Sequence, residues 1–191
     1  MNRIAAKAKQ NNQLVFAYSQ GEFNFKDIGP WGNVRNGYCA AMGFRWMAAI
    51  LDRSNLAFDP VTLEAPRQDW TITKEHNETK TLGYDAVMAV LGIKRDLSMK
   101  KTLAGAPSVG KILGFIGVRP GVYMLQYKRD GGGHLAAIRN DIDSYDYFDA
   151  NFGHFRFSSL AKFYNWYADF LLDTGYADRY QNSVILTKIT K

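Results

Sequence analysis

The stretch from Asn36 to Leu51 constrains the fold more than any other part of the chain, because it combines a strong helix signal with the only cysteine. Apolar side chains recur there at spacings of three and four residues, which predicts a helix over about residues 38–52. They are Ala40, Ala41, Phe44, Met47, Ala48 and Leu51. Alanine and glycine allow neighbouring elements to approach closely, so we expect a central helix that is packed on all sides.

Cys39 stands at the start of this predicted helix. The positive end of a helix dipole favours the thiolate over the thiol, and the thiolate is the nucleophilic form. The position therefore suits a catalytic cysteine. A lone cysteine is more often a buried, inert side chain, so the hypothesis depends on suitable partners elsewhere in the chain.

The composition restricts which class of protein this chain can be. The 191 residues are most simply one domain, and 47% hydrophobic residues can form a proper core. One cysteine excludes an internal disulfide, which fits a reducing compartment, and the N-terminus lacks the apolar segment of a Sec signal. No apolar run approaches the length of a membrane span. The net charge of +6 is scattered, so we expect no nucleic-acid partner and only a minor attraction to membrane surfaces.

Before Gly121 the chain is predicted to contain several helices separated by loops and a short strand. Residues 1–13 are expected to form a frayed helix or a mobile arm, and residues 14–18 a short strand. The region 54–77 is predicted to be a loop, residues 78–91 a helix and residues 94–103 a charged connector. The segment 105–112 resembles a phosphate-binding P-loop, but Ile112 replaces the required hydroxyl residue. We therefore predict an ordinary helix over residues 107–115.

From Gly121 the pattern changes to a period of two with β-branched and aromatic residues, which predicts strands. Strands are expected at residues 122–127, 134–139, 145–149 and 183–189, the first three as an antiparallel meander. A helix from Ser158, its proposed N-cap, to about Leu172 precedes the last strand. The fold class is therefore α+β.

Two residues of this meander can complete a site around Cys39. His134 would act as the base, and Asp149, on the adjacent strand, would orient its ring. Asp143 and Asp146 are weaker alternatives to Asp149. His154 is expected to lie on the surface or at the lip of the site, and His76 in solvent.

The oxyanion hole needs two hydrogen-bond donors. The backbone amide of Cys39 would be one, and the side-chain amide of Asn33 is our choice for the other, with Asn36 as the alternative. One cysteine and three dispersed histidines give no metal-ligand spacing, and no cofactor is expected.

Three segments carry a resemblance to a known family: residues 37–39 (Gly-Tyr-Cys), 133–136 (Gly-His-Leu-Ala) and 148–153 (Phe-Asp-Ala-Asn-Phe-Gly). Their order and spacing resemble the YopT/AvrPphB family of papain-like cysteine proteases, which are bacterial effectors. The resemblance implies a papain-like fold, in which a helical half with the nucleophile helix packs on an antiparallel sheet. It also implies that Cys39 is the nucleophile, His134 the base and Asp149 the orienting acid.

The sequence thus predicts a cysteine endopeptidase that forms a thioester acyl-enzyme. Residues 1–30 would be an arm or a pro-segment, and residues 31–191 the catalytic domain. By the resemblance, it is an effector or toxin that leaves its cell without a Sec signal. It would cut proteins of a host or target cell in a reducing cytosol. Two alternatives stay open: the same triad used for deamidation, transglutamination or acyl transfer, and a non-catalytic papain-like binding module.

Overall fold

The computed structural model describes residues 3–17, 39–52 and 82–191. The predicted loop at 54–77, the start of the predicted helix at 78–91 and His76 lie outside these ranges. Asn33 and Asn36 also lie outside them.

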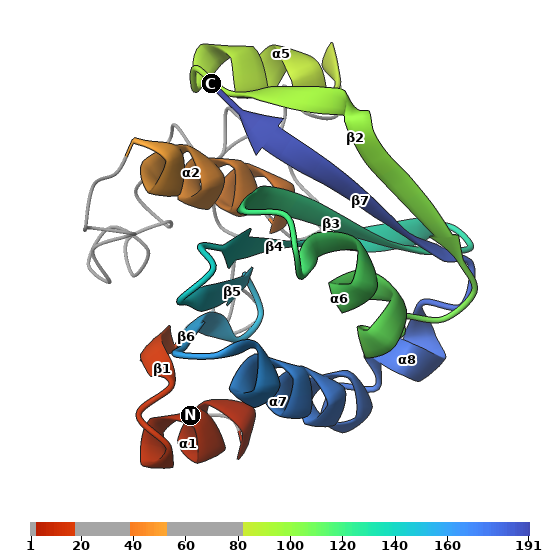
Figure 1. The fold of residues 1–191 in the computed structure, drawn as a ribbon. Helices are drawn as coiled ribbons and strands as arrows, with labels where there is room; N and C mark the ends of the chain where they lie inside the picture. Colours follow the sequence, from red (N-terminus) through yellow and green to blue (C-terminus); the bar gives the residue numbers. More distant parts are fainter. Residues whose placement is uncertain (1–2, 18–38, 53–81) are drawn as a thin grey trace, which may run out of the picture.

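A seven-stranded sheet forms the centre of the described part of the chain (Figure 1). Every strand pairs antiparallel to its neighbours, in the order β1-β6-β5-β4-β3-β7-β2. The strands are β1 (Leu14–Ala17), β2 (Lys94–Ala104), β3 (Gly121–Arg129), β4 (Gly132–Asn140), β5 (Tyr145–Asp149), β6 (Gly153–Phe157) and β7 (Ser183–Thr190). The predicted meander is therefore present as β3, β4 and β5.

Helices cover both faces of this sheet (Figure 1). They are α1 (Arg3–Gln10), α2 (Cys39–Leu51), α5 (Tyr84–Val90), α6 (Val109–Ile116), α7 (Leu160–Asp173) and α8 (Tyr176–Arg179). Residues of α2 and α5 share one core with one face of the sheet, whereas α1, α6, α7 and α8 share a second core with the other face. None of the helices in these described ranges is long and apolar enough to cross a membrane.

The core around α2 explains the small residues in that helix. Eight of its 13 residues are buried, from Ala40 to Ala48. The predicted central helix is therefore confirmed as an element packed closely against the sheet.

Several expected boundaries differ from the structure. The connector expected at 94–103 is the edge strand β2, whose exposed, charged side chains hide the strand pattern. Strand β6 and helix α8, of five and four residues, were not predicted. The N-cap of α7 is Ser159 and not Ser158, since the Ser159 side chain accepts a hydrogen bond from the Lys162 amide.

The first residues of the chain pack onto the sheet in this structure. Ile4 and Ala8 of α1 belong to the core that α7 covers, and Lys7 forms an ion pair with Asp169 at 2.7 Å. Strand β1 pairs with β6. Whether residues 1–30 are removed as a pro-segment stays a prediction.

Candidate active site

Cys39 is the first residue of α2, and this helix places it over β4. Its side chain is half-buried at the edge of the core that α2 shares with the sheet. One turn further along, Gly43 lies against Leu135 so closely that an added Cβ would lie 2.3 Å from Leu135 Cδ2. The backbone amide of Leu135 forms a hydrogen bond with the Cys39 side chain. A glycine at residue 43 thus allows the helix to bring its thiol to the strand that carries His134.

His134 is the third residue of β4, and its side chain is almost fully buried, with 6% of the residue exposed. Its Nε2 atom lies 2.9 Å from Oδ2 of Asp149. The rings of Tyr127, Tyr176 and Tyr180 surround the imidazole, with centroid distances of 6.2, 5.4 and 6.4 Å. Because Nε2 bonds to Asp149, Nδ1 is the nitrogen left for the hydrogen bond with Cys39.

Asp149, the last residue of β5, is fully buried and accepts four hydrogen bonds. Its Oδ2 atom accepts from His134, from the Tyr147 hydroxyl at 3.1 Å and from the Tyr176 hydroxyl at 3.2 Å. Its Oδ1 atom accepts from the backbone amide of Asn151 at 2.8 Å. These donors satisfy the buried carboxylate and fix its orientation.

The thiol and the imidazole shift each other's pKa in opposite directions. Burial alone raises the pKa of Cys39. The positive charge of His134 and the hydrogen bonds from its ring and from Leu135 lower that pKa below its ordinary value. Burial alone lowers the pKa of His134, but the charges of Asp149 and Cys39, with hydrogen bonds to both, raise it well above its ordinary value. These directions favour a thiolate–imidazolium pair.

The structure corrects the expectation for His154, which is fully buried and not at the surface. Its Nε2 atom lies 2.7 Å from Oδ1 of Asp146. The Asp146 carboxylate also pairs with Arg139 and Arg156. Asp146 and Asp149 are three residues apart on one strand, so their side chains point to opposite faces of the sheet. Asp146 therefore binds His154, and Asp149 is left for His134; Asp143 is exposed.

Some residues of the site were not found from the sequence. Tyr147 could have been, because the Tyr-x-Asp spacing on one strand puts Tyr147 and Asp149 on the same face. Tyr176, on the distant helix α8, gives no such signal. Tyr84 and Gln126 hydrogen-bond to each other, and the Tyr84 hydroxyl is near enough to Cys39 to feel its charge.

For the oxyanion hole, the described part of the site offers the backbone amide of Cys39. The first amides of a helix have no partner within that helix, and this one lies beside the thiol. Asn33 and Asn36 fall outside the described residues, so the second donor stays a prediction. Within the ranges that the structure describes, no group of three or more His, Cys, Asp or Glu side chains is placed to hold a metal ion.

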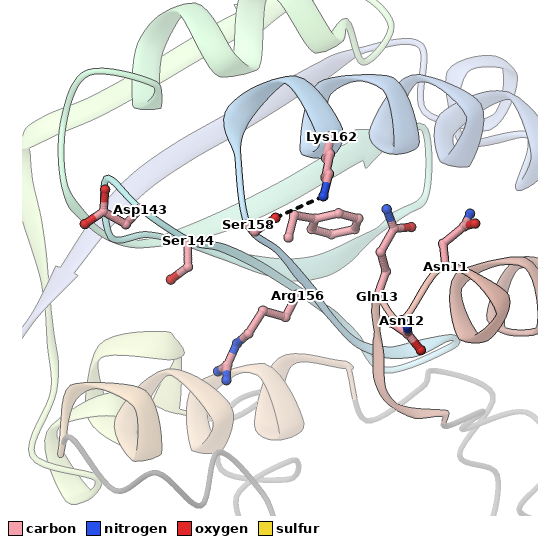
Figure 2. A pocket seen from close by; sticks show the side chains of 9 residues that line it. Asn11, Asn12, Gln13, Asp143, Ser144, Arg156, Ser158 and Lys162 are labelled. Atoms are coloured by element: carbon pink, nitrogen blue, oxygen red, sulfur yellow. Dashed lines mark hydrogen bonds between the residues drawn. The ribbon is translucent and has the colours of Figure 1, made fainter.

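A cavity of about 640 Å³ lies away from these residues. Figure 2 shows that polar side chains from the α1–β1 turn, the β4–β5 turn, β6 and the start of α7 line it. Cys39, His134 and Asp149 do not line this cavity. This cavity is therefore separate from the candidate active site.

Comparisons with known proteins agree with the fold. Residues 105–187 match the peptidase family described as Yersinia/Haemophilus virulence surface antigen. No curated protein sequence matches the chain. The structure is similar to that of the avirulence protein AvrPphB from Pseudomonas, with a TM-score of 0.60 and 14% identity over 95% of this chain and 99% of that one.

A second similar structure is PatoxP, a cysteine protease-like domain of the Photorhabdus asymbiotica toxin PaTox. The TM-score is 0.56 and the identity is 12%, over 97% of this chain and 57% of that one. At these identities the structures show the fold, and the family match adds the peptidase class. Family and fold together indicate a papain-like cysteine protease of the effector and toxin type. The resemblance of this chain to the YopT/AvrPphB family of papain-like cysteine proteases, first carried by three short motifs, is thus confirmed by the family match and by the α+β fold.

Proposed function

We propose that this protein is a cysteine endopeptidase in which Cys39, His134 and Asp149 form the catalytic triad. The observation that carries the proposal is the hydrogen-bonded line from the Cys39 thiol through the His134 ring to the buried Asp149 carboxylate. A nucleophile, a base and a group that orients the base are the parts that thiol hydrolysis requires.

In the first half of the reaction, the Cys39 thiolate attacks the carbonyl carbon of a peptide bond. Amides at the start of α2 would stabilise the negative charge on the carbonyl oxygen. The imidazolium of His134 gives its proton to the leaving amine, and a thioester between Cys39 and the substrate remains.

In the second half, neutral His134 takes a proton from water, and the resulting hydroxide attacks the thioester. The tetrahedral intermediate then expels the Cys39 thiolate and releases the carboxylic acid, while the proton stays on His134, so the starting thiolate–imidazolium pair is restored. Asp149 keeps one tautomer and one ring orientation throughout, because its Oδ2 atom accepts the Nε2–H bond.

The proposed substrates are proteins of a host or target cell. The support is the family match, and the similar structures are a Pseudomonas avirulence protein and part of a toxin. The single cysteine also suits a protein that works in a reducing cytosol.

Alkylation of Cys39 tests the chemistry without a known substrate. We would treat the folded protein with iodoacetamide from about pH 4 to 9 and measure the adduct by intact mass, because only the thiolate reacts. Rapid alkylation well below the ordinary thiol pKa is expected, and His134→Ala should abolish it. His154→Ala, which removes the other buried histidine near the sheet, is the matched control.

The alkylation result can overturn the proposal. An alkylation rate that follows an ordinary thiol pKa and does not change in His134→Ala would indicate a non-catalytic module.

If the thiol is activated, a second experiment identifies the reaction. The protein is incubated with a target-cell lysate, and the products are analysed by mass spectrometry. New peptide termini support an endopeptidase, whereas deamidated glutamine or new amide cross-links would assign the same triad to transfer chemistry.

A further inference from the structure

Three tyrosines from three different elements form a buried line that ends at the Asp149 carboxylate. Tyr147 of β5 lies 3.1 Å from Asp149 Oδ2, the hydroxyls of Tyr147 and Tyr127 of β3 are 3.2 Å apart, and those of Tyr127 and Tyr167 of α7 are 2.5 Å apart. All three side chains are fully buried. The line therefore runs from the covering helix α7 along the face of the sheet beneath it to the Asp149 carboxylate.

The direction of each hydrogen bond follows from the chemistry at the end of the line. An ionised carboxylate can only accept, so the Tyr147 hydroxyl donates its one hydrogen to Asp149. The bond between Tyr147 and Tyr127 must then be donated by Tyr127. By the same argument Tyr167 donates to Tyr127, so the three hydroxyls point toward the catalytic carboxylate in one chain.

The three tyrosine hydroxyls stay protonated, and so keep these hydrogen bonds, at any pH at which Cys39 would act as a nucleophile. Burial is the main reason that the pKa of each of the three tyrosines is raised above its ordinary value. All three are therefore neutral donors. Hydrogen bonds that share one direction strengthen one another in a medium of low dielectric constant.

We propose that Tyr147, Tyr127 and Tyr167 are positioning residues that hold Asp149 Oδ2 toward His134 and thereby maintain the thiolate–imidazolium pair. This inference rests on the proposed function of the site. A shorter branch acts on the same oxygen, in which the Asn151 side-chain amide donates to the Tyr176 hydroxyl at 3.1 Å and that hydroxyl donates to Asp149. The titratable side chains that face the His134–Asp149 pair are Cys39, Tyr127, Tyr147, Tyr176 and Tyr180.

The test compares phenylalanine variants, which keep the ring and remove only the hydroxyl. Tyr147→Phe removes the link to Asp149, and Tyr167→Phe removes the far end of the chain. Tyr123→Phe is the matched control. Tyr123 is also buried on β3, but its hydroxyl donates to the backbone carbonyl of Arg119 at 2.8 Å and takes no part in the line of tyrosine hydroxyls. Asp149→Ala shows how far the pH dependence of Cys39 alkylation changes when the whole carboxylate is lost.

The measurement is the pH midpoint of Cys39 alkylation by iodoacetamide in each folded variant. Without the Tyr147 hydroxyl the carboxylate is less well held, so imidazolium is less stabilised and the thiol pKa rises. One hydrogen bond of ordinary net strength corresponds to about a three- to tenfold lower alkylation rate on the acid side of the midpoint. Tyr167→Phe should shift the midpoint in the same direction by less, and Tyr123→Phe should leave it unchanged.

The outcomes separate this inference from the proposed function. One outcome is that Asp149→Ala shifts the alkylation midpoint while Tyr147→Phe and Tyr167→Phe have the same midpoint as the parent protein. In that case the line of tyrosines does not position Asp149, although the catalytic triad is still supported. If His134→Ala has no effect, the proposed function itself fails. Should Tyr147→Phe not fold, Tyr167→Phe decides the question. A second readout is the ¹⁵N resonance of Nε2 in ¹⁵N-histidine-labelled protein, assigned with His134→Ala, which should move in both chain variants and not in Tyr123→Phe.

Discussion

Gly43 and Leu135 are in direct contact: a Cβ atom added at Gly43 would lie 2.3 Å from Cδ2 of Leu135. Gly43 is one helical turn beyond Cys39, and Leu135 follows His134 on β4. The amide of Leu135 also forms a hydrogen bond with the Cys39 side chain. The contact that seats α2 on the sheet therefore also sets the position of the nucleophile relative to its base.

Gly43→Ala should push α2 away from β4 and weaken the site. Because Leu135 is only 2% exposed, it has little room to move, and overpacking of this kind costs about 1–3 kcal/mol of unfolding free energy. We expect a lower midpoint of urea unfolding and a Cys39 alkylation midpoint closer to that of an ordinary thiol. The control is Gly114→Ala in α6, where an added Cβ meets nothing within 4 Å. It should be neutral or stabilising by up to about 1 kcal/mol, and an equal loss in both variants would contradict the explanation.

Asp149→Asn and Asp146→Asn should have different effects, although each removes a buried carboxylate from a histidine. Asparagine at 149 removes the charge that supports the high pKa of His134, so the Cys39 thiolate should form only at higher pH. Asparagine at 146 removes the buried carboxylate charge that Arg139, Arg156 and His154 share, so it should lower the unfolding free energy by about 3–5 kcal/mol. In protein that remains folded, the Cys39 alkylation midpoint should not change. The measurements are urea unfolding and alkylation against pH. Equal shifts of the thiol midpoint would show that the two pairs are not independent.

His154 should make the protein less stable in mild acid. Burial is the main cause of its lowered pKa, so it stays neutral in the folded state at pH values where the unfolded chain, with a histidine pKa of about 6.5, takes up a proton. The stability that His154 contributes is thus fully present above about pH 6.5 and is lost toward the folded pKa as pH falls. We expect the difference in unfolding free energy between the parent protein and His154→Gln to shrink from pH 8 to pH 5. A constant difference would mean that His154 has the same pKa in the folded and unfolded chains, and a difference that grows toward pH 5 would mean that His154 is protonated in the folded state.

Ile4→Ala should destabilise the whole domain, because α1 contributes to the core beneath α7. Truncation of a buried isoleucine costs about 2–5 kcal/mol, and with 8% of Ile4 exposed we expect the lower end. Lys7→Ala on the same helix breaks only the exposed ion pair with Asp169, which contributes less than about 1 kcal/mol. Urea unfolding followed by tryptophan fluorescence would measure both. Equal, negligible effects would mean that α1 does not hold to the sheet in solution.

Much of the fold was predictable because burial leaves a local period in the sequence. The helix around Phe44 repeats apolar side chains at the helical period, and the last strand nearly alternates buried and partly buried residues. The three strands from Val122 to Asp149 are buried on both faces, so they stand out instead as apolar and aromatic runs between turns. Strand β2 has no such signal, since it lies at the edge of the sheet with its charged side chains in solvent. Strand β6 was not predicted, although it is as long as β5.

The sequence by itself determined that Cys39 begins a buried helix and that His134 and Asp149 stand on neighbouring antiparallel strands, because these properties depend on local pattern. Only the tertiary structure decided which carboxylate serves which histidine, because this depends on register. With Ala136 opposite Asp149 and Phe148 opposite His154, each Asp–His pair is diagonal across adjacent strands, one pair on each face of the sheet. The tyrosines that reach Asp149 come from β3, β5, α7 and α8, and side chains so far apart in sequence meet only when the packed core brings them together.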